Sequence, residues 1–368
     1  MKDLQLYLSE RAWPAPHKFQ PIASRFHSLR KPKSCSLLIL AKDHFTFTYP
    51  ILCSIAELKL GFSRTKDRIF ATYETISGWL SRRSKPVRNL VYRVLGGFFW
   101  LAYLRPASTV RPTMVGLAKH VGAPSATALF RSYVRRFMTG AELAERVRHG
   151  FGSELDGKLT IPDKSKLDMH LETGGVFLAL PHLHASVAMI RCLSQSYPVL
   201  AIVRLTRDKD RARAQHDLYK KVGCEFLDAR GDPPTTVARQ ILKALKAGKI
   251  VFGIVDRIQK PPATLIDKTK DVVRVTGFGS PVGFDGWPTR FAAKAQAPIL
   301  PGLVTQTDGR LTLLIGNAIA PSADIVASTQ DLVSQLEGFI TLHPDEWPFS
   351  VDKHWSRALQ NGAAEATT

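Results

Sequence analysis

The 368-residue sequence has few cysteines, few acidic residues and no long apolar run. Its four cysteines, Cys35, Cys53, Cys192 and Cys224, show no CxxC spacing, which argues against a zinc site or a disulfide framework and favours reduced thiols in a cytosolic setting. No stretch reaches the roughly 18 consecutive apolar residues of a transmembrane helix. The glycines form neither a GxGxxG nor a GxxxxGKS/T pattern, and a Gly-x-Ser-x-Gly motif is missing, so the sequence supports neither nucleotide binding nor a serine nucleophile.

The shortage of acidic residues leaves a strong positive charge. Against 31 Asp and Glu stand 51 Lys and Arg, which gives a formal net charge of +20. A charge of this size predicts a polyanionic partner, and an anionic membrane surface, an acidic protein and nucleic acid all have the required sign. No helix-turn-helix, zinc-ligand spacing or aromatic RNA-binding run is present, so nucleic acid is the least favoured of the three.

Short apolar runs alternate with helical patterns over residues 158–315. This alternation predicts an α/β fold with a mostly parallel sheet flanked by helices, preceded by a helical N-terminal portion. We predict three parts: an accessory region over 1–85 whose fold the pattern does not define, an α/β domain over 86–359, and a disordered tail over 360–368. The expected strands are 175–180, 199–203, 224–227, 250–255, 299–304 and, after an Asp-Gly turn, an antiparallel strand 310–315; the expected helices between them are 185–195, 210–222, 235–247 and 289–295.

The segment Val87–Leu104, VRNLVYRVLGGFFWLAYL, is apolar and aromatic but is interrupted by Arg88 and Arg93. Two interpretations fit it equally well. It is either a helix that lies in the membrane interface with its arginines at the headgroups, or a buried helix of the fold.

Two histidines follow the first predicted strand, in the segment GGVFLALPHLHASVAMIR. His182 and His184 lie where that strand crosses to a helix, and this edge is where ligands bind in open α/β sheets. A histidine has an unperturbed pKa close to neutral pH and therefore serves as a general base toward a hydroxyl when a carboxylate orients its ring. A core histidine that is satisfied by a backbone carbonyl is the alternative.

Charged and glycine-rich segments follow other predicted strands. Arg204 and Arg207 come after the strand 199–203 and are either ligands for a phosphate or carboxylate or part of a solvated helix face. Asp256 and Arg257 follow the strand 250–255 and form an acid/base pair, an anion clamp or only a surface ion pair. The segment 277–286, which includes Gly279, is interpreted as a glycine-rich loop before a helix, with N–H groups that can receive an anion.

The blocks GGVFLALPHLH, AIVRLTRDKD, FLDARGDPPTTVARQILKALKAGKIVFGIVDRI, GFGSPVGFDGWPTRFAAKAQAPILPGLV and LHPDEWPFSVDKHW, in this order, resemble the lipid A biosynthesis acyltransferases within the lysophospholipid acyltransferase superfamily. The resemblance covers about residues 90–357. It implies an α/β enzyme on the cytoplasmic face of the inner membrane, either peripheral or anchored in the interface. Such an enzyme moves a fatty acyl chain from acyl-carrier protein or acyl-CoA to a hydroxyl of a lipid A-like acceptor, without a metal or other cofactor.

The family signature is a histidine, four intervening residues and then Asp or Glu, and this sequence departs from it. Counting from His182 gives Val187 at the expected place of the acid, and counting from His184 gives Met189. Three explanations remain open. The acid has moved, with Asp256 the first candidate and Glu225 or Asp228 poorer ones; or His184 or a backbone carbonyl orients His182; or the protein is a catalytically lapsed relative that binds lipid or carrier protein.

The mechanism that the resemblance and the residues predict starts with His182 removing the proton of the acceptor hydroxyl, which attacks the thioester directly. Arg204, Arg257 or the N–H groups around Gly279 are the candidates for stabilising the oxyanion. The predicted partners are acyl-carrier protein, an anionic membrane surface and a lipid or glycolipid acceptor. A capsular or lipid-linked saccharide is the alternative acceptor, and a hydrolase that uses the same base is the alternative enzyme.

Overall fold

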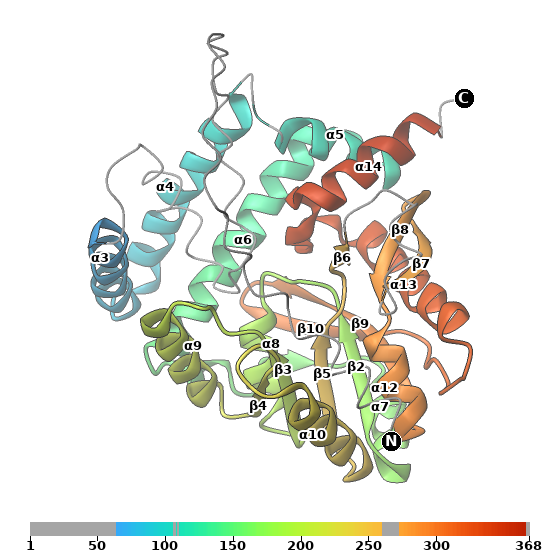
Figure 1. Cartoon of the computed structure of the whole chain (residues 1–368). Coiled ribbons are helices and arrows are strands. Elements are labelled where there is room, and N and C mark those ends of the chain that lie inside the picture. Colours follow the sequence, from blue (N-terminus) through green and yellow to red (C-terminus); the bar gives the residue numbers. More distant parts are fainter. Residues whose placement is uncertain (1–63, 106–107, 109, 260–271, 366–368) are drawn as a thin grey trace, which may run out of the picture.

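The computed structural model describes residues 64–105, 108, 110–259 and 272–365. Residues 1–63 of the accessory region predicted over 1–85, together with Cys35 and Cys53, lie outside the described residues. The rest of that region begins a helical portion, which leads into a mixed α/β body (Figure 1).

A seven-stranded sheet forms the centre of this body, in the order β1-β10-β9-β2-β5-β3-β4. The strands from β9 to β4 run parallel to one another, and β10 is antiparallel to β9. A second sheet of three antiparallel strands has the order β6-β8-β7. The bounds are β1 Leu159–Thr160, β2 Val176–Leu180, β3 Val199–Val203, β4 Glu225–Asp228, β5 Ile250–Ile254, β6 Ile258–Gln259, β7 Val272–Gly277, β8 Ser280–Asp285, β9 Ile299–Thr307 and β10 Arg310–Ile315.

Helices flank both faces of the large sheet. The helices of the described residues, including those of the helical portion, are α3 Arg64–Ser81, α4 Lys85–Leu104, α5 Val110–His120, α6 Ala126–Arg148, α7 Lys164–Thr173, α8 Ser186–Leu193, α9 Lys209–Val222, α10 Pro234–Lys246, α12 Trp287–Ala295, α13 Ile325–Leu342 and α14 Lys353–Glu365, with short 3-10 turns η2 Gly152–Leu155, η3 Pro344–Glu346 and η4 Pro348–Val351. The α/β class with a mostly parallel sheet, predicted from the alternating pattern, is confirmed.

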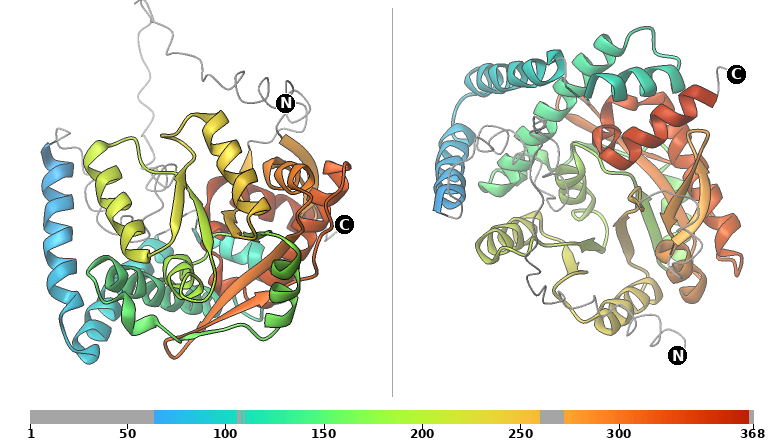
Figure 2. Two further views of the ribbon diagram at one scale, coloured as in Figure 1. Left: turned by 90° about the horizontal axis from the view of Figure 1, so that it is seen from below. Right: turned by 45° about the horizontal axis from the view of Figure 1, so that its top comes forward.

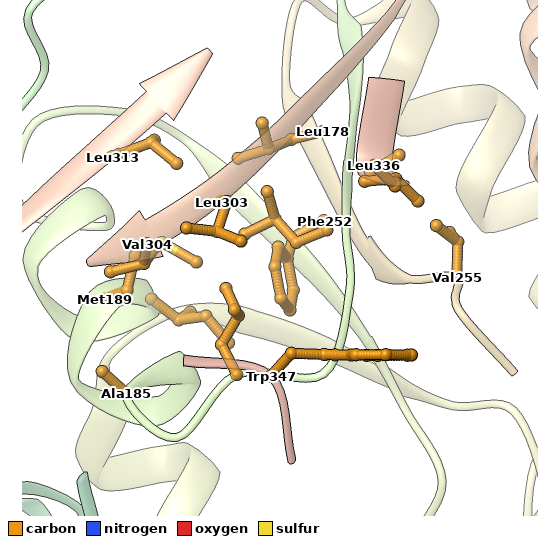
Figure 3. Close-up of a cluster of buried hydrophobic side chains, with 14 of the residues drawn as sticks. Leu178, Ala185, Met189, Phe252, Val255, Leu303, Val304, Leu313, Leu336 and Trp347 are labelled. Carbon is orange, nitrogen blue, oxygen red and sulfur yellow. The ribbon is translucent and has the colours of Figure 1, made fainter. Parts of the chain in front are cut away.

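The central strands are apolar along their whole length because both faces are covered. All five residues of β2 are buried, as expected for a parallel strand between two helical layers. On one face the ring of Phe177 packs edge to face against Trp287 of α12. On the other, Leu178 of β2, Phe252 of β5 and Met189 of α8 join residues of β9, β10 and α13 in one cluster (Figure 3). The same cluster holds Trp347.

The helical portion packs around α6. The side chain of Ser125 caps the N-terminus of α6 by accepting a hydrogen bond from the backbone N–H of Ala128. Helix α4 lies along α6, with Phe99 against Phe137, and α3 contacts the C-terminal end of α6. Both views of Figure 2 place α3 and α4 at the periphery of the molecule. Among the described residues, no helix has the length and apolar character needed to cross a bilayer.

The structure differs from the sequence-based expectation in two places. The segment predicted as a glycine-rich loop forms the β7–β8 hairpin, in which Phe278 and Gly279 make the turn with φ values of 49° and 71°. Two consecutive positive φ values match a tight hairpin turn. At the C-terminus, α14 continues to Glu365, where the sequence predicted a disordered tail from residue 360. The apolar face of α14, including Trp355 and Leu359, is buried, and this packing extends the helix beyond the predicted boundary.

Candidate active site

His182 and Asp256 occupy equivalent positions on two neighbouring strands. Strands β2 and β5 pair in parallel with Leu180 opposite Ile254, and the backbone N–H of Val255 donates to the Leu180 carbonyl at 3.0 Å. Each of the two side chains belongs to the second residue after its strand. Because the carboxyl ends of parallel strands meet at one edge, this register brings the imidazole and the carboxylate together.

The two side chains form a short contact in a nearly dry environment. His182 Nδ1 lies 2.5 Å from Asp256 Oδ1, and the two residues are 8% and 2% exposed. With Nδ1–H donating to the carboxylate, Nε2 is the nitrogen suited to accept a proton from a substrate. Of the three explanations for the missing acid at position 187, the geometry matches the one in which Asp256 takes its place.

Two tryptophans hold Asp256 from the other side. The indole Nε1–H of Trp347 donates to Asp256 Oδ2 at 2.7 Å, and that of Trp355 donates to the Asp256 backbone carbonyl at 2.6 Å. Sequence reasoning missed both residues as part of the site, although they stand in the closing block LHPDEWPFSVDKHW. They lie 91 and 99 positions from Asp256, so no local spacing links them to it.

His184 occupies a different environment from His182. It is buried, and its ring packs edge to face against Tyr133 and Phe137 of α6, with centroids 5.0 and 5.4 Å away. Burial lowers its pKa to about 3, against the opposing charge of Asp345, so His184 is neutral at physiological pH. The predicted alternative in which His184 orients His182 is therefore not the arrangement seen, because the carboxylate of Asp256 contacts His182 Nδ1.

The remaining acid candidates contact other groups. Asp228 accepts hydrogen bonds from the backbone N–H groups of Leu205 and Arg230, and it lies on the edge strand β4. Glu225 pairs with Lys249 at 2.5 Å on the surface. Only β5 separates β2 from β3 in the sheet, so a residue on β4 is three strands away from His182. Val187, at the position of the family acid, is a buried residue of α8.

The candidate anion-binding residues lie at the same sheet edge but are exposed. Arg204 follows β3 directly, Arg207 lies three residues further on, and Arg257 follows Asp256. Gly279 lies in the hairpin turn, and the neighbouring N–H of Phe278 already donates to Glu337 at 2.8 Å. That N–H already has an acceptor within the protein. The expectation was a glycine-rich loop before a helix, with N–H groups that can receive an anion.

Within the described ranges, no group of three or more His, Cys, Asp or Glu side chains is arranged to hold a metal ion. What the described residues supply at this edge is a buried imidazole–carboxylate pair with several guanidinium groups nearby in sequence. In chemical terms, such a pair can take up and return one proton.

Comparison with known proteins agrees with this chemistry. The model of a family described as "Bacterial lipid A biosynthesis acyltransferase" matches residues 126–355, more than half of the chain. A search of curated proteins gives no significant match. The matched range contains both members of the pair and both tryptophans that hold Asp256. The chain therefore belongs to the bacterial lipid A biosynthesis acyltransferase family.

Proposed function

We propose that this protein transfers a fatty acyl chain from a thioester donor, acyl-carrier protein or acyl-CoA, to a hydroxyl of a lipid A-like glycolipid. Family membership implies acyl transfer to a lipid acceptor. The observation that carries the finer proposal is the buried contact of 2.5 Å between His182 Nδ1 and Asp256 Oδ1. It supplies the oriented base that direct attack by a hydroxyl on a thioester requires.

In the proposed reaction, His182 Nε2 takes the proton of the acceptor hydroxyl while the oxygen attacks the thioester carbonyl carbon. The carbonyl π bond opens to an oxyanion, which then reforms the double bond and expels the thiolate of the donor. The proton on Nε2 passes to that thiolate, so the enzyme returns to its starting state. Asp256 stabilises the imidazolium that exists between the two proton transfers.

Arg257 and Arg204 are the proposed partners of the negative charges in this reaction. Arg257 is adjacent in sequence to Asp256, and both arginines are exposed at the carboxyl edge of the sheet. A guanidinium group there can bind either the oxyanion or the phosphate of the donor's phosphopantetheine arm. We propose that Arg207 binds the donor and not the oxyanion, because it lies further along the chain from the end of β3.

The net charge of +20 supports an acidic protein donor and an anionic membrane surface. We propose acyl-carrier protein as the donor, because its acidic surface complements this charge. Acyl-CoA carries the same phosphopantetheine arm, and the two donors are distinguished by direct comparison of their kcat/KM values.

Helices α3 and α4 form the proposed membrane contact, on the cytoplasmic side of the inner membrane. The face of α4 that points away from α6 exposes Leu90, Val94, Phe98, Leu101 and Leu104, each at least half exposed. Helix α3 buries Leu80 and makes polar contacts with α6, while Ile76 and Trp79 are about half exposed. A contiguous exposed apolar surface of this kind marks a contact with lipid or protein.

The polar contacts of α3 are with α6. Ser77 donates to Glu145, and Arg148 pairs with Glu74, while Ile76 and Trp79 are about half exposed on α3. Exposed basic residues surround the apolar face at the α3–α4 connection and along α4, namely Arg82, Arg83, Lys85, Arg93 and Arg105. An apolar face bordered by cations is complementary to an anionic leaflet. We name the exposed residues Ile76, Trp79, Leu90, Val94, Phe98, Leu101 and Leu104 the α3–α4 face.

The test of the proposed function is acyl transfer by the purified protein, with radiolabelled acyl-acyl-carrier protein as donor and lipid A precursors as acceptors. His182→Ala and Asp256→Asn are expected to lower kcat by at least about 100-fold, because general-base catalysis contributes a factor of this order. His216→Ala is the matched control, since the His216 side chain is 43% exposed and its Nδ1 lies 3.9 Å from Asp217 Oδ1.

Full activity in His182→Ala would overturn the proposed mechanism. Transfer to a capsular or lipid-linked saccharide instead of a lipid A precursor would keep the mechanism and change the acceptor. Release of free fatty acid with no acylated product would identify a hydrolase.

A further inference from the structure

The Asp256 carboxylate is hydrogen-bonded on both oxygens, and its backbone carbonyl is bonded as well. Oδ1 faces His182, Oδ2 accepts from Trp347, and the main-chain oxygen accepts from Trp355. All three donors are buried, and Trp347 has no exposed surface at all. A carboxylate in this surrounding has one orientation, because rotation about its side-chain bonds would break both contacts at once.

The two indoles come from the C-terminal segment and support each other. Trp347 follows the turn η3 and Trp355 lies in the first turn of α14, and their rings meet edge to face with centroids 5.2 Å apart. Phe278 closes the group from the β7–β8 turn, stacked on Trp347 at 5.6 Å and edge to face on Trp355 at 5.9 Å. Phe278 holds a positive φ of 49°, which is rare for a bulky residue and persists only where the surroundings fix it.

Trp347 is also fixed from its opposite side. Figure 3 shows Trp347 in the same buried cluster as Phe252 of β5, Val255 at the end of β5 and Leu336 of α13. The preceding residue, Glu346, accepts hydrogen bonds from the backbone N–H and the side-chain amide of Gln306 on β9, at 2.9 and 3.3 Å. The residue that precedes Trp347 is therefore tied to β9 by contacts that do not involve Asp256.

We propose that Trp347 and Trp355 are positioning residues that make Asp256 a working replacement for the missing acid at position 187. This inference rests on the proposed function, in which His182 is the base. Position 187 lies in helix α8, whereas Asp256 lies in the segment after β5 and is not held by helical backbone hydrogen bonds. The two indoles of the C-terminal segment fix its orientation instead. Trp347 sets the plane of the carboxylate, and Trp355 sets the backbone from which the carboxylate projects.

Packing alone is the competing explanation, because both rings also fill space in the core. Trp347→Phe keeps much of the ring but removes the N–H and leaves Oδ2 buried without this donor. A sharper variant replaces Trp347 by β-(3-benzothienyl)alanine, in which sulfur stands in place of the N–H and the bicyclic shape is kept. Trp287→Phe is the matched control, since Trp287 packs on Phe177 and Phe291 in the other layer of helices.

Both Trp347 variants are expected to lower kcat by about 10- to 100-fold with little change in KM, which is the range expected for losing a hydrogen bond to a charged group. Trp355→Phe is expected to lower kcat less, because it acts on the carboxylate only through the backbone. A second readout does not need turnover. The proton between His182 Nδ1 and Asp256 Oδ1 should give a downfield 1H NMR resonance in the wild-type protein, and this resonance should move or broaden in the Trp347 variants but not in Trp287→Phe.

Unchanged kcat and an unchanged downfield resonance in the benzothienyl variant would overturn the inference and leave Trp347 as a packing residue. The failure of the proposed function has a different signature. In that case His182→Ala retains activity, whereas the resonance still reports whether the indole orients the carboxylate. If Trp347→Phe unfolds, the benzothienyl variant decides the matter, because it preserves the volume and shape of the side chain.

Discussion

At the scale of single residues, the site depends on which ionisable groups are held in one state by burial. The two histidines illustrate this, because His182 Nδ1 lies 2.5 Å from Asp256 Oδ1, whereas the ring of His184 is buried against two aromatic rings. Glu346, next to Trp347, is a third case, in which a carboxyl group is buried behind the site.

Glu346 makes stability depend on pH near neutrality. Burial raises its pKa from 4.5 to about 7, although hydrogen bonds from Gln306 and the charge of Arg136 oppose the change. A carboxyl group whose pKa is higher in the folded than in the unfolded state adds to the free energy of unfolding. This contribution is complete below the unfolded-state pKa and is lost as pH rises through the folded-state pKa. We therefore expect Glu346 to lower the free energy of unfolding as pH rises from about 4.5 to about 7, by about 3 kcal/mol at most.

The measurement is urea unfolding of the wild type and Glu346→Gln at a series of pH values. The difference in stability between the two should change over the interval from about 4.5 to about 7 and stay constant outside it. Glu172→Gln, an exposed position on α7, is the control. Parallel pH curves for the wild type and Glu346→Gln would contradict the prediction.

At the scale of elements, the loop that carries His182 is pressed against α6. A Cβ added at Gly140 of α6 would lie 2.4 Å from the carbonyl oxygen of His184. A helix backbone can approach the loop this closely only at a residue without a side chain. Gly140 thus connects the helical portion of the chain to the edge of the sheet where the imidazole lies.

Gly140→Ala is expected to destabilise the protein by about 1 to 3 kcal/mol, the usual cost of inserting a methyl group where there is no room. Gly97→Ala is the matched control, because Gly97 is also in a helix interior and nothing lies within 4 Å of its added Cβ. There the better helix propensity of alanine should be neutral or stabilising by up to about 1 kcal/mol. Chemical denaturation compares the stabilities of the two variants. Equal stability would contradict the prediction and show that the loop carrying His184 moves without a loss of free energy of unfolding.

The pattern of the sequence predicted the elements of the large sheet well. Strands β3 and β10 have the predicted bounds, and β2, β5, α9 and α10 differ by one residue at their ends. The β7–β8 hairpin and α13 were not predicted. Alternation of buried and exposed residues in β7 is a strand signal, but the glycines that follow it were interpreted as a loop.

The contact between His182 and Asp256 could be expected from the sequence because it needs only the pairing of β2 with β5. Once the ends of β2 and β5 lie side by side, His182 and Asp256 have equal offsets from paired residues, and the short contact follows. The hydrogen bonds from the two tryptophans to Asp256 could not be predicted from the sequence. The positions of the two indoles depend on how η3 and α14 pack near the β7–β8 hairpin. The hydrophobic periodicity of the sequence does not indicate this packing.

At the scale of the whole molecule, the charge and the α3–α4 face together predict the mode of membrane contact. We expect the full-length protein to sediment with vesicles that contain phosphatidylglycerol and to bind neutral phosphatidylcholine vesicles more weakly. Each Lys or Arg near an anionic surface contributes about 1 kcal/mol, so high salt should weaken the binding.

The double variant Leu90→Glu, Leu101→Glu should lose most of this binding because it places two charges in the apolar face. Leu342→Glu is the control, since Leu342 is 74% exposed at the end of α13. Vesicle binding that survives the double variant would show that the contact lies elsewhere. A large fall in the melting temperature without lipid would show that another part of this chain covers the face.

The long separation in sequence between His182, Asp256 and the two tryptophans has a consequence for how the protein folds during synthesis. The imidazole, the carboxylate and the two indoles enter the chain at positions 182, 256, 347 and 355, so the last component is synthesised 173 residues after the first. A chain on the ribosome can pair β2 with β5 early, yet the carboxylate gains its indole donors only when the C-terminal segment folds back. If His182 is the base, as proposed, a chain that ends before Trp347 would carry the imidazole and the carboxylate without the two indole donors.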